Sequence, residues 1–509
     1  MTNIQKVSTP VAKPKLDIVE EITTGIQALL GELGKGRVDG VAYDTAWVAR
    51  LAPHYPDHGF ENSLDWLRQN QHDDGTWGAP LVHYHDRFIS TLASIVALQE
   101  VGHELRDHRR IKRGEAALWK LIGQLGWDNN DTVGFPILSA SLAEEATKLG
   151  LDVPHPPVRF GERYRQKVTS LLSQSSRDWR TTSLSFSLEA MRTFVKPDDY
   201  VLERNNSVHI SPSATAGYLL LRDDKMALSY LDSVMQNDSS GIFPALSPID
   251  TFEIAWALNY LHRNGAVQPD NVEVRRALHV LNTAWSQENG LTYSSFVSLG
   301  DIDDTAAAYA TLNWGKYKVS HSVFSFYETD SHFCCFPGET DPSISAHVRL
   351  LIALRIFAAD AQCQRWIDKT LYALQEFDAT GSFWADKWHS SPYYVTSAAL
   401  YALQGIADDL AQSRLKWILR TQNDDGGWGY LGVSTPEETA YCLEALLFWD
   451  RTVERIDQTI LDASANYLSL HLNDKYYAPL WIGKSLYTPY NVVKAVILSA
   501  LFSYYTWCS

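Results

Sequence analysis

The feature that most constrains the fold is a polar, glycine-containing turn that recurs between apolar segments and ends on an aromatic residue. Two copies are nearly identical, QNQHDDGTWG at residues 69–78 and QNDDGGWG at residues 422–429. Looser versions occupy residues 236–244, 286–293 and 378–388. Recurrence at intervals of roughly 50 residues is typical of helix-pair repeats, in which each pair buries its apolar face against the next. The pattern predicts helical hairpins closed into α/α barrels.

Between these turns, apolar residues recur at i, i+3, i+4 and i+7, as in ISTLASIVALQEV (residues 89–101) and TFEIAWALNYLHR (residues 251–263). This spacing is typical of helices, and strand-like alternation is scarce. The expected fold class is therefore all-α. A glycine turn after a helix is a routine helix stop, so Trp77 and Trp428 are predicted to be structural staples without chemistry.

Size and charge narrow the function classes. The chain has 509 residues, too many for one ordinary core, and two large domains are expected. A net charge of −16 without a basic stripe argues against a nucleic-acid partner. The chain has 17 Trp and 25 Tyr residues but only 4 Met. The flat aromatic faces suit a hydrophobic core and also a cavity for a hydrophobic or cationic ligand.

The cysteines and termini indicate a cytoplasmic protein. The five cysteines show no CxxC or Cys/His spacing, which predicts neither a disulfide framework nor a zinc site. Residues 1–14 are polar and are expected to form a flexible tail rather than a secretory signal. The apolar run at residues 495–507 is too short to cross a bilayer, which leaves peripheral membrane contact open. The sequence does not predict the oligomeric state.

The strongest chemical signal is SLGDIDDTAAAYA, in which Asp301, Asp303 and Asp304 precede an uncharged, alanine-rich helix. One reading is an inert helix cap, because acidic residues are favoured at helix N-termini. However, a cap needs only one carboxylate, and three close carboxylates repel one another unless at least one holds a proton. Magnesium binding is the rival reading, but the chain has no DDxxD motif and no second motif that would complete a diphosphate clamp.

A proton-holding carboxyl group among aromatic residues suggests protonation of an alkene. An Asp with an ordinary pKa of about 3.9 cannot protonate a carbon-carbon double bond in water. The acid would have to be neutral, the site dry, and the new carbocation stabilised as it forms. Aromatic faces stabilise a cation without acting as nucleophiles or bases.

These motifs resemble those of a known family. DIDDTA at residues 301–306 resembles the DxDD signature of class II terpene cyclases, and the Gln/Trp turns resemble the QW repeats of that superfamily, which includes squalene-hopene cyclases. Further segments resemble bacterial and plant copalyl-diphosphate-type synthases in the same order: AYDTAWVARL, HDRFISTLA, FCCFPGE, WADKWHSSPYY, PEETAYCLEAL and APLWIGKSLY. The resemblance extends from about residue 35 to residue 503.

The resemblance implies two α/α barrels, named β and γ, with the active cavity between them. It implies that residues 40–265 form the γ domain, and that residues 266–509 form the β domain with an N-terminal helix at residues 15–35 packed on it. Asp303 would be the proton donor. Asp301 and Asp304 would orient it and hold its proton.

In relatives an Asn or His contacts this acid from the helix that reads SISAHVRLL here, which makes His347 or Arg349 the candidate. His347 is preferred because an Arg contact would lower the pKa of the Asp.

The substrate head group stays open between two classes. Relatives that process diphosphates carry an acidic cluster where this chain reads GWDNNDTVGFP, so Asp128 and Asp131 remain as candidate Mg²⁺ ligands while Pro136 replaces a Glu. A solvated loop is the plainer reading of these two residues. The site could still take geranylgeranyl diphosphate with help from Arg87 or Lys484. It could equally take a geranylgeranylated aromatic acid, as meroterpenoid cyclases of the merosterolic acid synthase type do. The chemistry itself would need no cofactor.

Aromatic residues elsewhere are candidates for the cavity wall. The resemblance suggests Trp256, Trp388, Tyr393 and Tyr394 as substrate-binding residues, against the alternative that they pack in the core.

The expectation is an isomerase that protonates the terminal alkene of a linear C20 prenyl chain and cyclises it to a fused polycycle. One alternative is a prenyl-binding barrel related to protein prenyltransferase β subunits, which would need Asp, Cys and His ligands for zinc. Others are a squalene-hopene-type triterpene cyclase and a noncatalytic helical scaffold.

Overall fold

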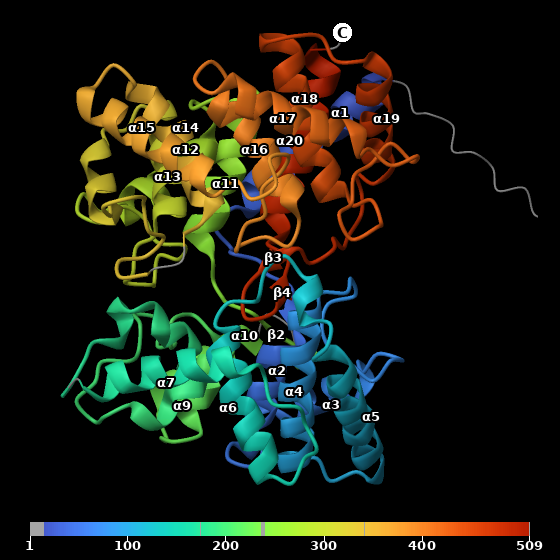
Figure 1. Ribbon diagram of the computed structural model, residues 1–509, viewed down its shortest axis with the longest axis vertical. Coiled ribbons are helices and arrows are strands. Elements are labelled where there is room, and N and C mark those ends of the chain that lie inside the picture. Colours follow the sequence, from blue (N-terminus) through green and yellow to red (C-terminus); the bar gives the residue numbers. More distant parts are fainter. Residues whose placement is uncertain (1–14, 174, 236–239, 340–341, 508–509) are drawn as a thin grey trace, which may run out of the picture.

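The computed structural model describes residues 15–173, 175–235, 240–339 and 342–507. The predicted tail at residues 1–14, the first part of the turn at residues 236–244, and Cys508 lie outside these ranges. The described residues form helices joined by turns, with two short antiparallel strand pairs, which confirms the all-α expectation. Figure 1 shows two helical bodies, one above the other.

The lower body is a barrel of five inner helices. Contacts run from α2 to α4, α6, α8 and α9 and back to α2, which closes the ring, while outer helices α3, α5, α7 and α10 pack on this ring or beside it. The bounds of the elements in this body are β1 (Gly40–Val41), α2 (Ala42–Ala49), α3 (Glu61–Gln69), α4 (Tyr84–Val101), α5 (Leu105–Leu121), α6 (Phe135–Lys148), α7 (Val158–Leu172), α8 (Leu188–Met191), α9 (Pro212–Leu219), α10 (Lys225–Met235) and β2 (Phe243–Pro244).

The upper body is a barrel of six inner helices. Contacts run from α11 to α13, α14, α16, α18 and α20 and back to α11, with α1, α12, α15, α17 and α19 outside. The bounds are α1 (Lys15–Glu32), α11 (Asp250–Arg263), α12 (Val272–Ala284), α13 (Ile302–Trp314), α14 (Ile344–Leu354), α15 (Ala361–Glu376), α16 (Pro392–Leu403), α17 (Asp408–Arg420), α18 (Pro436–Thr452), α19 (Gln458–Leu470), β3 (Trp481–Ile482), β4 (Leu486–Tyr487) and α20 (Tyr490–Trp507).

The boundary between the residues of the two apolar cores lies earlier in the chain than the sequence predicts. Phe243 belongs to the lower core, whereas Ala245 and the buried residues of α11 belong to the upper core. The expected boundary after residue 265 therefore falls too late. The amphipathic pattern of α11 identifies a buried helix, but not which of two neighbouring barrels buries it.

The Gln/Trp turns make the same set of hydrogen bonds in both barrels. Gln71 Nε2 donates to the carbonyl of Gly75 at 2.9 Å and to a carbonyl on the next outer helix at 3.0 Å, and the Trp77 indole N–H donates to the carbonyl ten residues earlier at 2.8 Å. Gln422 and Trp428 repeat these contacts with carbonyl groups at equivalent positions. Each turn thus closes a helix end and ties it to the neighbouring hairpin.

A hairpin from the upper body connects the two barrels. Strands β3 and β4 lie between the bodies in Figure 1, and the Leu486 amide donates to Asp86 Oδ1 of the lower barrel at 3.0 Å. Within the described ranges no helix combines the length and hydrophobicity needed to span a membrane. The four described cysteines are buried free thiols.

Candidate active site

The acidic cluster lies at the start of α13, an inner helix of the upper barrel. Asp301 is the N-cap residue, and its Oδ1 accepts a hydrogen bond from the Asp304 amide at 2.8 Å. Asp303 and Asp304 lie in the first turn and are 9% and 4% exposed. Capping therefore explains Asp301 and leaves two buried carboxyl groups without that explanation.

Asp303 holds a proton at neutral pH. Burial, reinforced by the nearby charge of Asp386, raises its pKa to about 8, while Arg349 opposes this rise. The Ser345 hydroxyl donates to Asp303 Oδ2 at 3.2 Å, and Oδ1 has no hydrogen-bond partner. The group is thus a neutral carboxylic acid with one oxygen held and the other left for its proton.

Asp301 and Asp304, beside it, also have raised pKa values. Burial and the charge of Asp304 raise the pKa of Asp301 well above its usual range, and the Asp301 carboxyl hydrogen-bonds Asp304. Burial also raises the pKa of Asp304, to about 6, although bonds from Asp301 and Trp256 stabilise its charged form. The Trp256 indole N–H donates to Asp304 Oδ1 at 3.1 Å. Of this pair, Asp304 is therefore the more readily ionised member.

Asp386 is a part of the site that sequence reasoning missed. Its Oδ1 accepts hydrogen bonds from the Ser343 hydroxyl and the Ser345 amide, both at 2.9 Å, which anchors it at the start of α14. Its negative charge favours the neutral form of Asp303. The signals were the SxS sequence at a helix start and the Asp in WADKW, but nothing in the sequence pairs them.

His347 does not make the contact expected of it. Its Nδ1 lies 2.6 Å from the carbonyl oxygen of Ser343, and its Nε2 accepts the Phe333 amide at 3.2 Å. Residues 345 and 349 are one helical turn apart and share a face, whereas residue 347 lies on another face. Ser345 is therefore the partner of Asp303 on this helix, and Arg349 is its charged neighbour.

An aromatic cluster extends from the acidic group. Trp256 lies 5.2 Å from Phe252, 5.5 Å from Trp481 and 6.1 Å from Tyr394, measured between ring centroids. The guanidinium of Arg349 lies 3.6 Å above the Trp256 ring. Trp481 comes from strand β3 and was not among the predicted wall residues, because its segment resembled a motif without a stated role.

The other two predicted wall residues have further packing partners. Tyr393 stacks on Trp417 of outer helix α17 at 4.5 Å, and its place in the cavity wall stays a prediction. Trp388 is half-buried and meets Phe336 edge-on at 6.1 Å. In the described residues, these contacts give both rings packing partners outside the Trp256 cluster.

Arg87 is buried and committed to protein acceptors. It donates to the Thr76 hydroxyl at 2.5 Å and to the carbonyl groups of Ala79 and Pro80 at 2.8 and 3.2 Å. The cation thus holds the first Gln/Trp turn against α4. This contradicts its expected role in binding a substrate head group.

Lys484 is also buried and bonded to protein acceptors. Its ammonium group, at the tip of the β3–β4 hairpin, lies 2.7 Å from Glu189 Oε1 and 2.7 Å from the hydroxyl oxygens of Ser211 and Ser213. The side chains of Lys484 and Glu189 are both 0% exposed. The expected substrate contact is replaced by an ion pair between the two barrels.

Comparisons with known proteins place the chain in a family. It is 36% identical over 489 residues to the type B diterpene cyclase of Mycobacterium tuberculosis, an alignment that covers 92% of this chain and 96% of the relative. The chain belongs to the class II diterpene cyclase family. No protein-family model matches this cyclase. Its fold matches the structure of ent-copalyl diphosphate synthase from Streptomyces platensis with a TM-score of 0.77 and 26% identity, covering 96% of this chain and 99% of that one.

Plant relatives are longer. The cyclase is 31% identical over 343 residues to the chloroplastic ent-copalyl diphosphate synthase of Arabidopsis thaliana, covering 66% of this chain and 42% of the relative. The alignment therefore spans less than half the length of that plant enzyme. The near-complete match to a bacterial diterpene cyclase favours the cyclase reading over the prenyltransferase-like and scaffold alternatives.

The residues expected to bind Mg²⁺ do not fit that ion. Asp128 Oδ2 accepts hydrogen bonds from the His85 amide at 2.9 Å and meets the His85 and His83 ring nitrogens at 2.8 and 3.3 Å. Asp131 supplies no ligand atom to this group. Mg²⁺ takes oxygen ligands in near-octahedral geometry, whereas two of the three donors here are imidazole nitrogens.

The fold also assembles an Asp/Cys/His group that the sequence spacing did not predict. Ligand atoms of His321, Asp360 and Cys363 all lie within 4.8 Å of one another. Asp360 Oδ1 already caps α15 by accepting the amides of residues 362 and 363. Sequence spacing could not show this group, because the fold brings His321 beside residues 360 and 363 from another part of the chain.

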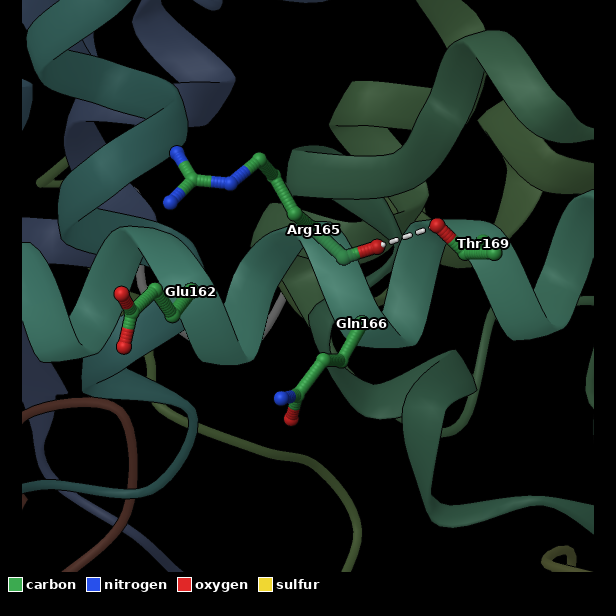
Figure 2. Close-up of a pocket in the computed structure, with 4 residues that line it drawn as sticks. All are labelled: Glu162, Arg165, Gln166 and Thr169. Atoms are coloured by element: carbon green, nitrogen blue, oxygen red, sulfur yellow. Dashed lines mark hydrogen bonds between the residues drawn. The ribbon is translucent and has the colours of Figure 1, made fainter.

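A further pocket, of about 660 Å³, lies on α7 of the lower barrel. Figure 2 shows its lining, which comes from one helix face: Glu162, Arg165, Gln166 and Thr169. The only bond drawn among them runs from the Thr169 hydroxyl to the Arg165 carbonyl within the helix. None of the predicted site residues lines this pocket.

Proposed function

We propose that this cyclase protonates the terminal alkene of geranylgeranyl diphosphate through Asp303 and cyclises the chain to a fused, copalyl- or labdane-type diphosphate. The feature that carries the proposal is a buried carboxyl group whose pKa is raised to about 8 and whose Oδ1 has no hydrogen-bond partner. A neutral carboxylic acid in a dry site is the initiator that alkene protonation requires.

The acid step moves one proton. The Asp303 O–H bond breaks, its hydrogen bonds to the terminal alkene carbon, and a tertiary carbocation forms. The carboxylate left behind gains the Ser345 hydrogen bond and the charge of Arg349, both of which favour the ionised form. These two groups therefore stabilise the product of proton transfer more than its reactant.

The later steps need shape and π faces rather than further acids. Internal double bonds attack the cation in turn, and loss of one proton to a base ends the sequence, so that substrate and product are isomers. Trp256, Trp481 and Tyr394 present aromatic faces near the acid, and such faces stabilise a passing cation. No cofactor is required for this chemistry.

The contacts around Asp386 support a position for the substrate. The Asn130 side chain of the lower barrel donates to the Asp386 carbonyl at 2.8 Å, and the Ile482 amide of the hairpin donates to the Trp388 carbonyl at 2.9 Å. These contacts bring the acid's neighbour to the junction of the barrels. They support a substrate site between the two domains.

The choice of diphosphate over an aromatic acid rests on relatives. The Streptomyces platensis and plant proteins carry names of copalyl diphosphate synthases, and the mycobacterial protein that of a diterpene cyclase. The poor fit of Asp128 and Asp131 to Mg²⁺ means that the diphosphate would be held without that pair.

The test is product analysis by mass spectrometry after separate incubations with geranylgeranyl diphosphate and geranylgeranyl dihydroxybenzoate. We expect a cyclic isomer of the diphosphate and no conversion of the aromatic acid. Conversion of the aromatic acid alone would contradict the diphosphate substrate and indicate a meroterpenoid cyclase. No cyclic product from either substrate would overturn it.

A further inference from the structure

A buried group of two histidines and one aspartate lies in the lower barrel where the chain enters α4. It consists of His83 and His85, at the start of that helix, and Asp128, from the loop before α6. Their side chains are 4%, 6% and 5% exposed. His83 Nδ1 also caps α4 by accepting the Asp86 amide at 3.4 Å, but a cap does not explain a second imidazole and a carboxylate buried beside it.

The distances are close to those of a coordinated metal. Asp128 Oδ2 lies 2.8 Å from His85 Nδ1 and 3.3 Å from His83 Nδ1, and all three ligand atoms lie within 4.8 Å of one another. Bonds of about 2.0 to 2.1 Å in tetrahedral geometry place ligand atoms about 3.3 Å apart. Shifts of a few tenths of an ångström to about 1.5 Å in side-chain atoms would therefore admit an ion.

The surroundings orient the ligands. Asp128 Oδ2 also accepts the His85 amide at 2.9 Å, and the backbone of Asn130 hydrogen-bonds the His83 ring. The Phe135 ring meets the His85 ring edge-on with 4.6 Å between centroids. Of these contacts, the Asn130 backbone bond to the His83 ring and the apolar cover are of the kind that protein zinc sites use to fix ring orientation and limit solvent.

We propose that His83, His85 and Asp128 bind a divalent metal of borderline softness, of the Zn²⁺ class. Two nitrogen donors and one carboxylate suit Zn²⁺ and similar transition metals, and disfavour Mg²⁺ and Ca²⁺, which take oxygen ligands. None of the three residues belongs to the acid or the aromatic cluster of the upper barrel.

The location gives the metal a structural role. The loop that carries Asp128 also contacts the upper barrel, through the Asn130 side chain on the Asp386 carbonyl at 2.8 Å and the Val133 amide on the Gly483 carbonyl at 2.8 Å. A metal that joins this loop to α4 would hold one side of the barrel junction in place. It would fix the start of α4 to the loop that makes these interdomain contacts.

The test measures zinc bound to the purified full-length chain, after dialysis against Zn²⁺ and then metal-free buffer, by mass spectrometry of the metal. All proteins carry Cys363→Ser, which removes the thiol from the His321, Asp360 and Cys363 group. We expect about one equivalent in this background and its loss in the added variant His85→Ala. Zinc should also raise the melting temperature of the background by a few degrees, about the shift that binding well above Kd produces.

The matched control is His58→Ala. His58 Nδ1 lies 2.8 Å from Asp232 Oδ1, the same separation as in the His85 and Asp128 pair, but these two residues belong to no three-ligand group found in the described chain. It should retain the zinc and the melting shift. If His85→Ala misfolds by circular dichroism, His83→Asn replaces it. Less than about 0.2 equivalents in the background, or equal zinc with and without His85, would overturn the proposal and leave a hydrogen-bonded cluster.

Discussion

Replacing Asp303 by Asn will abolish turnover of geranylgeranyl diphosphate, with a loss of at least about 10³-fold, within the range attributed to a positioned general acid. The change keeps the shape of the side chain and removes the transferable proton. Product formation measured by mass spectrometry over long incubations sets the limit. Turnover within tenfold of the wild type would mean that the initiating acid lies elsewhere.

The matched control is Asp44→Asn in the lower barrel. Asp44 is fully buried, and burial raises its pKa to about 7, while Lys484 opposes this rise. It therefore shares the raised pKa of Asp303 but lies outside the acidic cluster of the upper barrel. This variant should keep turnover within about threefold. Loss of activity in both variants to the same extent would point to a general effect of buried carboxyl groups on the fold.

The same Asp303→Asn variant should be more stable than the wild type at pH 7. The native pKa is raised to about 8, so folding at pH 7 takes up a proton that the unfolded chain lacks. The stability given by this group is fully present below about pH 4 and is lost as the pH rises through 8. We expect the advantage of Asn, of order a few kcal/mol at about 1.4 kcal/mol per pKa unit, to shrink toward pH 4.

Replacing Lys484 by Met will destabilise the protein by about 3–5 kcal/mol, because it leaves the Glu189 carboxylate buried without its cation. The pair is 0% exposed and joins the hairpin of the upper barrel to α8 of the lower one. The readout is the midpoint of thermal unfolding by calorimetry. Adding Glu189→Gln should recover more than half of the loss, since no charge is then stranded.

The control for this effect is Lys35→Met. Lys35 forms an ion pair with Glu32 at 2.8 Å, but the two side chains are 62% and 56% exposed. Its loss should cost about 1 kcal/mol or less, as is usual for solvent-exposed pairs. Equal shifts in Lys484→Met and Lys35→Met would contradict the account of an interdomain ion pair.

Periodicity and the repeated Gln/Trp turns were sufficient to predict the helical barrels, because both depend on neighbours within a few turns of the chain. The DIDD motif likewise predicted an acid at a helix start. Its local signal is strong because one cap cannot explain three carboxylates. The comparisons confirm the fold class and the family that these motifs indicated.

The partners of these residues were harder to predict. Ser345 and Asp386 lie near Asp303 only because the barrel closes. The spacing of residues in the sequence does not show which of them that closure brings together. Preferring His347 to Arg349 overlooked helix phase: Ser345 makes the bond to Asp303, Arg349 shares its face, and two residues along a helix turn a side chain by about 200°. Arg87 and Lys484 were assigned to substrate by charge, although burial gives each of them protein acceptors.

The protonation state of Asp303 at neutral pH is the central claim, and infrared difference spectroscopy measures it directly. Spectra of the wild type minus Asp303→Asn, taken from pH 5 to pH 10, isolate the carbonyl stretch of that one protonated carboxyl group. The account predicts a protonated-acid band at pH 7 that disappears with a midpoint near 8. A carboxylate signal at pH 7, with the acid band already lost at pH 5, would contradict it.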